Sequence, residues 1–220
     1  MLVVPAEFSR NSPTVTSLMT PEQSGVWLLE WMRLQIGFDS YADKKVLDFG
    51  CGVRFTQAII NTDFPFGRYF GVDVHRPMIE FLQREVRDGR FAYHFLDAHH
   101  PMYNPGGRPL TPETVLPIAE HDFDVACMFS VITHQYPDDS RSILTMLRRH
   151  VGARGRLFFS CFLDDSIGTF EDRSPNRNGG RCFYDPDFLK SIVESCGWRL
   201  VSTAPSVGPL IGQSFVYRAA

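Results

Sequence analysis

Short apolar runs alternate with amphipathic stretches along most of this chain. Several of the runs end at glycine or aspartate, and near-continuous apolar runs are typical of strands buried on both faces of a sheet. The pattern predicts strands over residues 46–49, 69–73, 91–96, 123–129, 155–163, 198–203 and 213–218. It predicts helices over 56–61, from Pro77 to about Val86, after a cap at Asp138 or Asp139, and over 185–196.

The order of these elements favours an α/β fold. Strands that alternate with helices form a mainly parallel sheet with right-handed crossovers. The last two predicted strands have no helix between them and are joined only by residues 204–212, which contain Pro and Gly. Such a connection makes an antiparallel pair. We therefore expect a mostly parallel sheet with one reversed strand at its edge.

A further helix is predicted before the first strand. Thr20 can cap it, Pro21 suits its first turn, and Gln23 can return a hydrogen bond to the cap. The helix continues to about Gly37 with many apolar positions, so it should pack on the body or cover a pocket. The residues before Thr20 show no pattern and are expected to be irregular. The predicted division is therefore an N-terminal segment and helix, 1–43, followed by one domain, 44–220.

Composition and charge exclude several classes of protein. The 220 residues carry a formal net charge of −3, with 44% hydrophobic and 21% charged residues, which is ordinary for a globular chain. This balance gives no strong field for nucleic acid. We find no signal peptide and no apolar stretch of roughly 20 residues, so no membrane partner is expected.

The cysteines and a histidine pair indicate neither a disulfide framework nor a metal site. The five cysteines are odd in number and form no C-x-x-C pair, which predicts reduced thiols in the cytoplasm. His99 and His100 are adjacent, but zinc needs more ligands in a suitable arrangement. We expect both histidines to lie in a loop near the rim of the ligand site, with no metal.

Three acidic residues follow predicted strands, at Asp48, Asp73 and Asp97. Open α/β sheets bind ligands beyond the carboxyl ends of their strands. The glycines in DFGCG, residues 48–52, permit close approach of a ligand, and an acid about 20 residues later can hold ribose hydroxyls. The plainer alternative for these residues alone is a tight turn and a surface aspartate.

A nicotinamide dinucleotide is the main competing ligand for this glycine turn. Two features disfavour it. Asp48 precedes the glycines, where it suits an amino group better than a pyrophosphate. The stretch GCGVRF, residues 50–55, also lacks the third glycine of the dinucleotide fingerprint.

Four stretches together resemble the class I S-adenosylmethionine-dependent methyltransferases. They are VLDFGCG at 46–52, GVD at 71–73, LDA at 96–98 and FDVACMFSVITH at 123–134, and the resemblance covers roughly residues 44–218. It implies a Rossmann-like methyltransferase fold: a doubly wound, mostly parallel seven-stranded sheet with one antiparallel edge strand. It also implies that residues 44–220 bind S-adenosylmethionine and leave S-adenosylhomocysteine as product.

The same resemblance implies a role for each binding residue. The implied contacts are Asp48, Gly50, Cys51 and Gly52 for the methionine part, Asp73 for both ribose hydroxyls, Val74, Met78, Asp97 and Ala98 for the adenine, and Phe129 and Ser130 on the sulfonium side.

One departure concerns Arg54. The family usually has a third glycine shortly after the position of Gly52, whereas this chain reads Val53-Arg54-Phe55 as if that glycine were deleted. The turn is then expected to be tighter. Arg54 either forms a salt bridge with the cofactor carboxylate or points to solvent, and the sequence leaves both open.

His134 is the candidate catalytic base. Methyl transfer from a sulfonium mainly needs alignment and exclusion of water, and a base is required only when the acceptor must lose a proton. His134 follows the fourth predicted strand toward the expected pocket, and an ordinary imidazole titrates near pH 6.5, which suits proton abstraction. The alternative is a loop histidine that caps or positions a helix.

Two long loops are expected to shape the acceptor site, because long loops in compact domains are commonly functional. They span 100–117 and 164–181, the second containing Asn178-Gly179-Gly180. The second loop and the helix at 20–37 are expected to form a lid.

The function predicted is S-adenosylmethionine-dependent methylation of a small or medium-sized acceptor, with oxygen as one candidate atom. The alternatives are a protein or lipid-linked acceptor, or a protein that binds the cofactor without catalysis. Nucleic acid is disfavoured by the charge and by the absence of an Asn/Asp-Pro-Pro-aromatic sequence after the fourth strand. The sequence does not indicate the oligomeric state.

Overall fold

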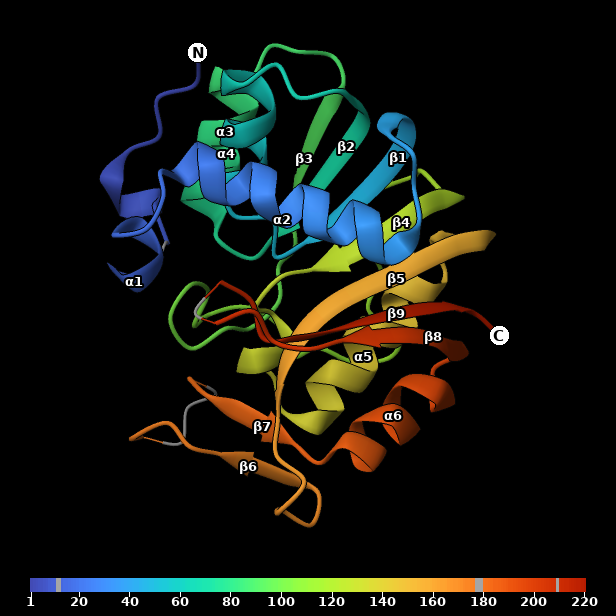
Figure 1. Cartoon of the computed structure of the whole chain (residues 1–220). Coiled ribbons are helices and arrows are strands. Elements are labelled where there is room, and N and C mark those ends of the chain that lie inside the picture. The colour runs from blue at the N-terminus through green and yellow to red at the C-terminus, as the bar shows by residue number, and fades with distance from the viewer. Residues whose placement is uncertain (11–12, 177–179, 209) are drawn as a thin grey trace.

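One sheet with helices on both faces forms the body of the protein (Figure 1). The computed structural model describes residues 1–10, 13–176, 180–208 and 210–220. The strands are β1 (Tyr41–Phe49), β2 (Phe66–Asp73), β3 (Phe91–Phe95), β4 (Phe123–Met128), β5 (Val151–Leu163), β6 (Phe170–Asp172), β7 (Cys182–Tyr184), β8 (Trp198–Ala204) and β9 (Gln213–Ala219). The helices are η1 (Ala6–Phe8), α1 (Pro13–Thr16), α2 (Pro21–Ile36), α3 (Arg54–Asn61), α4 (Arg76–Glu85), η2 (Ile132–His134), α5 (Pro137–Arg148) and α6 (Pro186–Ser195).

The order of the strands confirms the doubly wound α/β fold. Strands β3, β2, β1, β4 and β5 are neighbours and pair in parallel. On β1, Leu47 aligns with Phe70 of β2 and with Ala126 of β4. Strand β9 runs antiparallel to both β5 and β8, so the reversed strand lies one position in from the edge that β8 forms. Seven strands thus follow the predicted arrangement.

Two short strands that the sequence pattern missed extend the sheet to nine strands in the described parts of the chain. The last residues of β5 continue past the pairing with β9, and Phe162 and Leu163 align in parallel with Phe183 and Tyr184 of β7. Strand β6 pairs with β7 in turn. The segment 164–181, expected to be a loop, therefore contains a strand. Three-residue strands are too short to show a periodic pattern, and their pairing depends on the position of β5.

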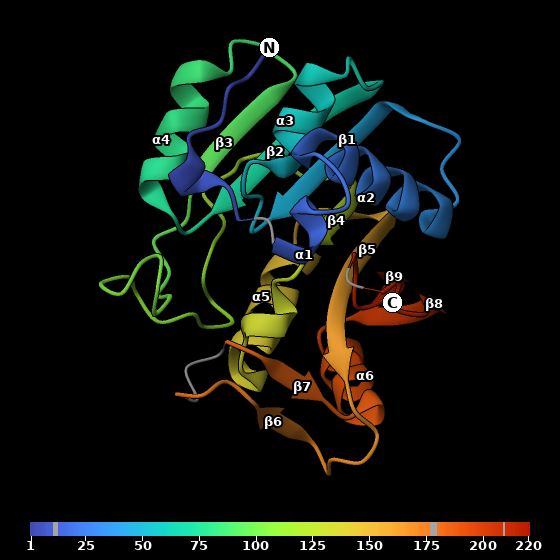
Figure 2. The same cartoon turned by 60° about the vertical axis from the view of Figure 1, so that its left-hand side comes forward.

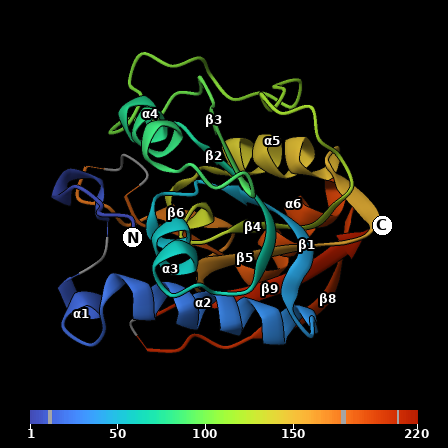
Figure 3. The ribbon, with the colours of Figure 1, turned by 90° about the horizontal axis from the view of Figure 1, so that it is seen from above.

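The two faces of the sheet carry different helices. Helices α2, α3 and α4 pack on one face with Val46 and Phe158, while α5 and α6 pack on the other with Leu47 and Phe159. Seen from above, α2 and α5 lie on opposite sides of the strands (Figure 3). Successive side chains of a strand point to opposite faces, so the apolar runs of β1 and β5 serve both cores.

The helix starts follow local chemistry, with one correction. At α2 the predicted capping box forms, with Gln23 N–H donating to Thr20 Oγ1 at 3.2 Å. The expected cap of α5 at Asp138 or Asp139 is wrong, because the N-cap is Tyr136 and Pro137 takes the first helical position. Proline favours that position, which places both aspartates in the first turn near the positive end of the helix dipole.

The N-terminal segment lies against α4 (Figure 2). Phe8 is buried, and its ring centroid is 5.3 Å from that of Phe81 on α4. The segment is not wholly irregular, since it contains η1 and the four-residue helix α1. Strand β1 begins at Tyr41, so the division expected after residue 43 falls within a strand. Within the described residues, no helix is both long and apolar enough to cross a membrane.

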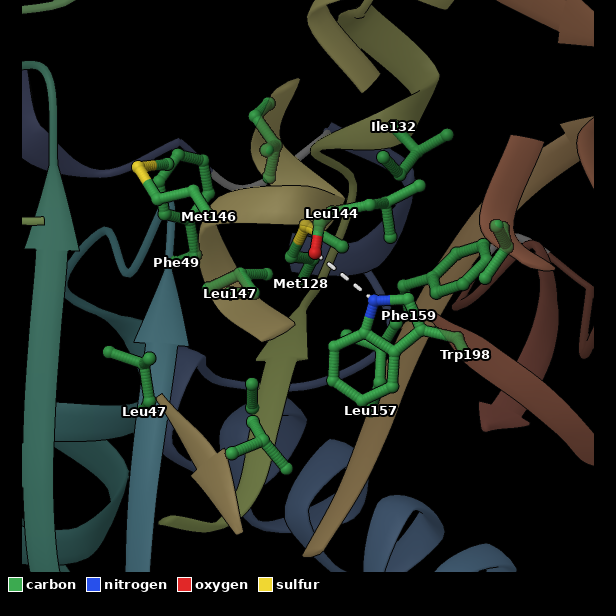
Figure 4. Packing of buried hydrophobic residues seen from close by; sticks show 14 of the residues in the cluster. Leu47, Phe49, Met128, Ile132, Leu144, Met146, Leu147, Leu157, Phe159 and Trp198 are labelled. Carbon is green, nitrogen blue, oxygen red and sulfur yellow. Dashed lines mark hydrogen bonds between the residues drawn. The ribbon is translucent and has the colours of Figure 1, made fainter. Parts of the chain in front are cut away.

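Trp198 ties β8 to α5 in the core (Figure 4). Its buried indole N–H donates to the Leu144 carbonyl at 3.1 Å.

We expect Trp198→Phe to lower the free energy of unfolding by about 1–3 kcal/mol, because buried ring volume and a hydrogen bond are lost. Urea denaturation measures this. Trp27→Phe, at a partly buried position on α2, is the control and should cost less; equal losses would contradict the interpretation.

Candidate functional site

A cavity of about 670 Å³ opens at the carboxyl ends of β1, β2 and β4. The strand order reverses between β1 and β4, which is where open α/β sheets bind their ligands. Of the predicted site residues, those that line this cavity are Asp48, Gly50, Cys51, Gly52, Arg54, Asp73, Val74, Phe129, Ser130 and His134. The topology therefore gathers most of the predicted residues around one space.

The turn after β1 is held against β2. The N–H groups of Gly50 and Cys51 both donate to the Val72 carbonyl, at 2.7 and 3.2 Å. Gly50 has φ of +74°, and a Cβ there would stand 2.5 Å from Val131 Cγ2. A side chain at this position would be strained and would also collide, so the turn requires glycine.

Asp48 is a buried carboxylate held by its neighbours. The Tyr69 hydroxyl donates to Asp48 Oδ2 at 2.6 Å, and the Cys127 thiol lies 3.5 Å from Oδ1. Burial raises the pKa of Asp48 to about 7, although both hydrogen bonds act in the opposite direction. The carboxylate is thus poised to gain or lose its charge near neutral pH, and a bound cation would favour the charged form.

Asp73 ends β2 with both carboxylate oxygens engaged. The Gly52 N–H donates to Oδ2 at 3.1 Å, and the His75 N–H donates to Oδ1 at 2.9 Å. The Arg10 guanidinium approaches Oδ2 to 3.8 Å. Asp73 is therefore fixed at the cavity wall and joins the glycine turn, α4 and the N-terminal segment.

Arg54 does not point freely into solvent, which was one of the two alternatives for it. It opens α3, is only partly exposed and lines the cavity. Burial lowers its pKa, and no carboxylate of the described residues forms an ion pair with it. A largely buried cation that lacks an anionic partner in the protein is costly unless a ligand supplies one.

The segment after β4 carries the third group of cavity residues. Ser130 has φ of +57°, which is rare outside glycine, and its N–H donates to the buried Ser160 hydroxyl at 3.2 Å. Such strain often marks a functional site. His134 is exposed and lines the cavity from η2, and Tyr136, not His134, caps α5. Its role as a base stays a prediction.

Three predicted adenine contacts lie outside the residues that line the cavity. Met78 and Ala98 are buried in the two cores. Asp97 is exposed, accepts a hydrogen bond from Asn104 and pairs with Arg108. Leu96, one residue earlier, lines the cavity instead.

Sequence reasoning missed several cavity residues. Phe8 and Arg10 come from the segment that showed no pattern, so no local signal marked them. The loop at 100–117 contributes Tyr103 and Leu110, and His99 and His100 line the cavity as expected. From the proposed lid, Leu28 of α2 and Gly180 line the cavity; Asn178 and Gly179 lie outside the described residues.

Nothing in the described part of the chain forms a metal centre. There, no group of three His, Cys, Asp or Glu side chains is arranged to hold an ion. The five cysteines are unpaired, and four of them are buried. The polar groups that line the largely apolar cavity include carboxylates, guanidinium groups and imidazoles.

The fold and this cavity define a Rossmann-like α/β protein with a nucleotide-type site at the carboxyl edge of its sheet. A family model described as "Methyltransferase domain" matches residues 30–203. The chain belongs to this family and is a methyltransferase domain, the class of enzyme that the sequence analysis expected.

Solved structures share the fold at low sequence identity. The glycopeptide N-methyltransferase MtfA has a TM-score of 0.63 and 10% identity, over 96% of this chain and 100% of that one. A Burkholderia thailandensis 1,6-didemethyltoxoflavin-N1-methyltransferase, solved with 1,6-didemethyltoxoflavin and S-adenosylhomocysteine, has a TM-score of 0.62 and 18% identity, over 93% and 80% of the two chains. A mitomycin 7-O-methyltransferase has a TM-score of 0.57 and 16% identity. The match covers 90% of this chain but only 53% of that one, so this chain spans about half the length of that enzyme.

The Tyr69 hydroxyl should control the titration of Asp48. Tyr69→Phe removes a hydrogen bond that favours the carboxylate, so the pKa of Asp48 should rise above 7 by about one unit or more. Carboxyl-carbon NMR over a pH series measures it. Tyr93→Phe is the matched control, since its hydroxyl bonds to Thr56. An unshifted Asp48 titration in Tyr69→Phe would refute the assignment.

Proposed function

We propose that this protein binds S-adenosylmethionine in the cavity and transfers its methyl group to a small-molecule acceptor. The observation that carries the proposal is the pairing of two buried carboxylates, Asp48 and Asp73, with the largely buried cation Arg54 around one space. These groups complement an ammonium, a ribose diol and a carboxylate, which this cofactor presents together.

Each of these side chains fits one part of the cofactor. Asp48 would take the ammonium group, because a nearby cation favours its charged form. Arg54 would take the cofactor carboxylate, which gives the buried guanidinium its missing partner. Asp73 would accept from the ribose hydroxyls, and the apolar side chains of Val74 and Leu96 would pack near the base.

When bound, the cofactor supplies an activated methyl group on a sulfonium. The protein orients the acceptor and excludes water. Phe55 and Phe129 pack edge to face with centroids 4.9 Å apart and line the cavity, so they keep this part apolar. His134 would remove the proton from an acceptor hydroxyl or ammonium. The acceptor lone pair would form the bond to the methyl carbon as the methyl–sulfur bond breaks, and S-adenosylhomocysteine would leave with the electron pair of that bond.

The size of the cavity supports a small acceptor. A volume of about 670 Å³ lies within the range of small-molecule and cofactor sites, and the cofactor occupies part of it. Two of the structures named above are described as a mitomycin 7-O-methyltransferase and a 1,6-didemethyltoxoflavin-N1-methyltransferase, so the fold serves acceptors of this kind. Five unpaired thiols favour a reducing compartment, which we propose is the cytoplasm.

Cofactor binding should depend on Asp73, Arg54 and pH. Asp73→Asn and Arg54→Met should each weaken S-adenosylhomocysteine binding by about tenfold or more in calorimetry, because each loses a charge-assisted hydrogen bond. Arg84→Met, exposed on α4, is the control.

The affinity for S-adenosylhomocysteine should also rise by up to about tenfold from pH 6 to pH 8, because Asp48, whose pKa is about 7, becomes ionised over this range. An affinity for S-adenosylhomocysteine that is unchanged in both variants and between pH 6 and pH 8 would refute the assignment.

Turnover should depend on His134 if the acceptor loses a proton. His134→Ala should bind S-adenosylhomocysteine normally but transfer tritiated methyl groups about 100-fold more slowly, since general-base assistance is lost. His121→Ala, which removes an exposed imidazole outside the residues that line the cavity, serves as the control. Undiminished turnover in His134→Ala would remove it from the mechanism.

A further inference from the structure

Apart from the largely buried Arg54, the acidic and basic side chains of the cavity lie at different depths. The carboxylates Asp48 and Asp73 are only 1% and 3% exposed. Nearer to solvent, the cavity is lined by Arg10, His99, His100 and His134, which we call the basic rim. We call the two carboxylates, Asp48 and Asp73, the acidic floor. A cofactor bound at the acidic floor would leave an acceptor beside it facing the hydrogen-bond donors of the basic rim.

Arg10 is the arginine of the basic rim. Two aromatic contacts hold it in place, one with its own side chain and one through Phe8 in the same segment. Its guanidinium lies over the Tyr103 ring, 3.7 Å from the centroid, with an exposed fraction of 29% for the side chain. Phe8, two residues earlier, anchors the segment by packing edge-on against His75, with centroids 5.7 Å apart. Arg10 and Tyr103 both line the cavity, so the stacking on Tyr103 is a second contact, besides that with Asp73, that holds the guanidinium there.

His100 shows that the members of the rim lie close together. Its Nδ1 accepts from the N–H groups of Met102 and Tyr103, both at 3.2 Å, so the neutral ring carries its proton on Nε2. Burial, with His134 and Arg10 nearby, lowers the pKa of His100 to about 4, against the opposing charge of Asp73. His100 is thus a neutral ring with a donor at Nε2, in the same cavity as Arg10 and His134. Asp139 and His99 interact electrostatically.

Binding of the proposed cofactor changes what Arg10 can do. In the proposed complex, the ribose hydroxyls and Arg10 would compete for Asp73, whose Oδ2 is 3.8 Å from the guanidinium. A ligand that donates hydrogen bonds to Asp73 releases Arg10 while Tyr103 retains it over the cavity. The guanidinium then lacks an anion, next to His134, which is the candidate base.

We propose that the acceptor is an organic acid with an apolar body, whose carboxylate is bound by Arg10 once the cofactor has taken Asp73. The inference rests on the proposed function and adds the substrate class. Arginine binds carboxylates through two parallel hydrogen bonds, and His100 offers a third donor. The body of the acid would face apolar cavity residues: Leu28, Phe55, Phe129 and Ile211.

Charge arithmetic favours a monoanion. Among the described cavity residues, Arg10 and Arg54 balance Asp48 and Asp73, and the proposed cofactor adds one net positive charge. One carboxylate neutralises that excess. A dianion would overcompensate it and would place a second negative charge near the buried acids.

The experiment uses wild-type protein saturated with S-adenosylhomocysteine and three probes: benzoate, benzamide and phenyl phosphate. Ligand-observed NMR titration measures each affinity. Benzoate should bind at least about tenfold more tightly than benzamide, which has the same shape without the charge. Arg10→Gln should remove that preference and leave benzamide unchanged, whereas Arg84→Gln, exposed on α4, should behave like wild type.

Calorimetry with S-adenosylhomocysteine separates this role from a cofactor contact. Arg10→Gln should bind it as tightly as wild type or more tightly, because the competitor for Asp73 is gone. Weaker cofactor binding, equal affinities for benzoate and benzamide, undetectable benzoate binding, or a preference for phenyl phosphate would each overturn the inference. Failure of wild type to bind S-adenosylhomocysteine would overturn the proposed function, and the inference with it.

Discussion

The site depends on burying two carboxylates at the ends of neighbouring strands. Asp48 aligns with Gly71 in the β1–β2 register, and Asp73 lies two residues beyond, so their charges repel and help raise the pKa of Asp48. Buried charges are tolerated only where donors compensate them. The Tyr69 hydroxyl supplies one, and the N–H groups of Gly52 and His75 supply two more.

This constraint links the architecture to the chemistry. The glycine turn approaches β2 closely, and its N–H groups reach Val72 and Asp73. It has no room for a side chain at Gly50, because a Cβ there would stand 2.5 Å from Val131 Cγ2, in the segment after β4. The carboxylates then form an acidic floor, which Arg10 of the N-terminal segment approaches, and Arg54 of α3 lines the same cavity. A zwitterionic nucleoside fits this alternation of charge better than a pyrophosphate does, because Asp48 would repel the pyrophosphate.

Contacts with distant segments account for what the sequence pattern missed. Arg10 reaches Asp73 across 63 positions of the chain, and no periodicity marks such an approach. Strand β6 exists because β7 pairs with the end of β5. Asp97, a predicted adenine contact, is exposed, and its carboxylate contacts Asn104 and Arg108 in the following loop.

The sequence by itself determined the alternation of strands and helices, the glycine turn and the carboxylates at strand ends, because these follow from hydrophobic period, backbone freedom and the meeting of parallel strands at one edge. Only the tertiary structure decided which side chains share the cavity. It buried Arg54 without a carboxylate partner in the described protein and stacked Arg10 on Tyr103. The physical reason is that such pairings depend on the packing of whole segments, which local propensity does not encode.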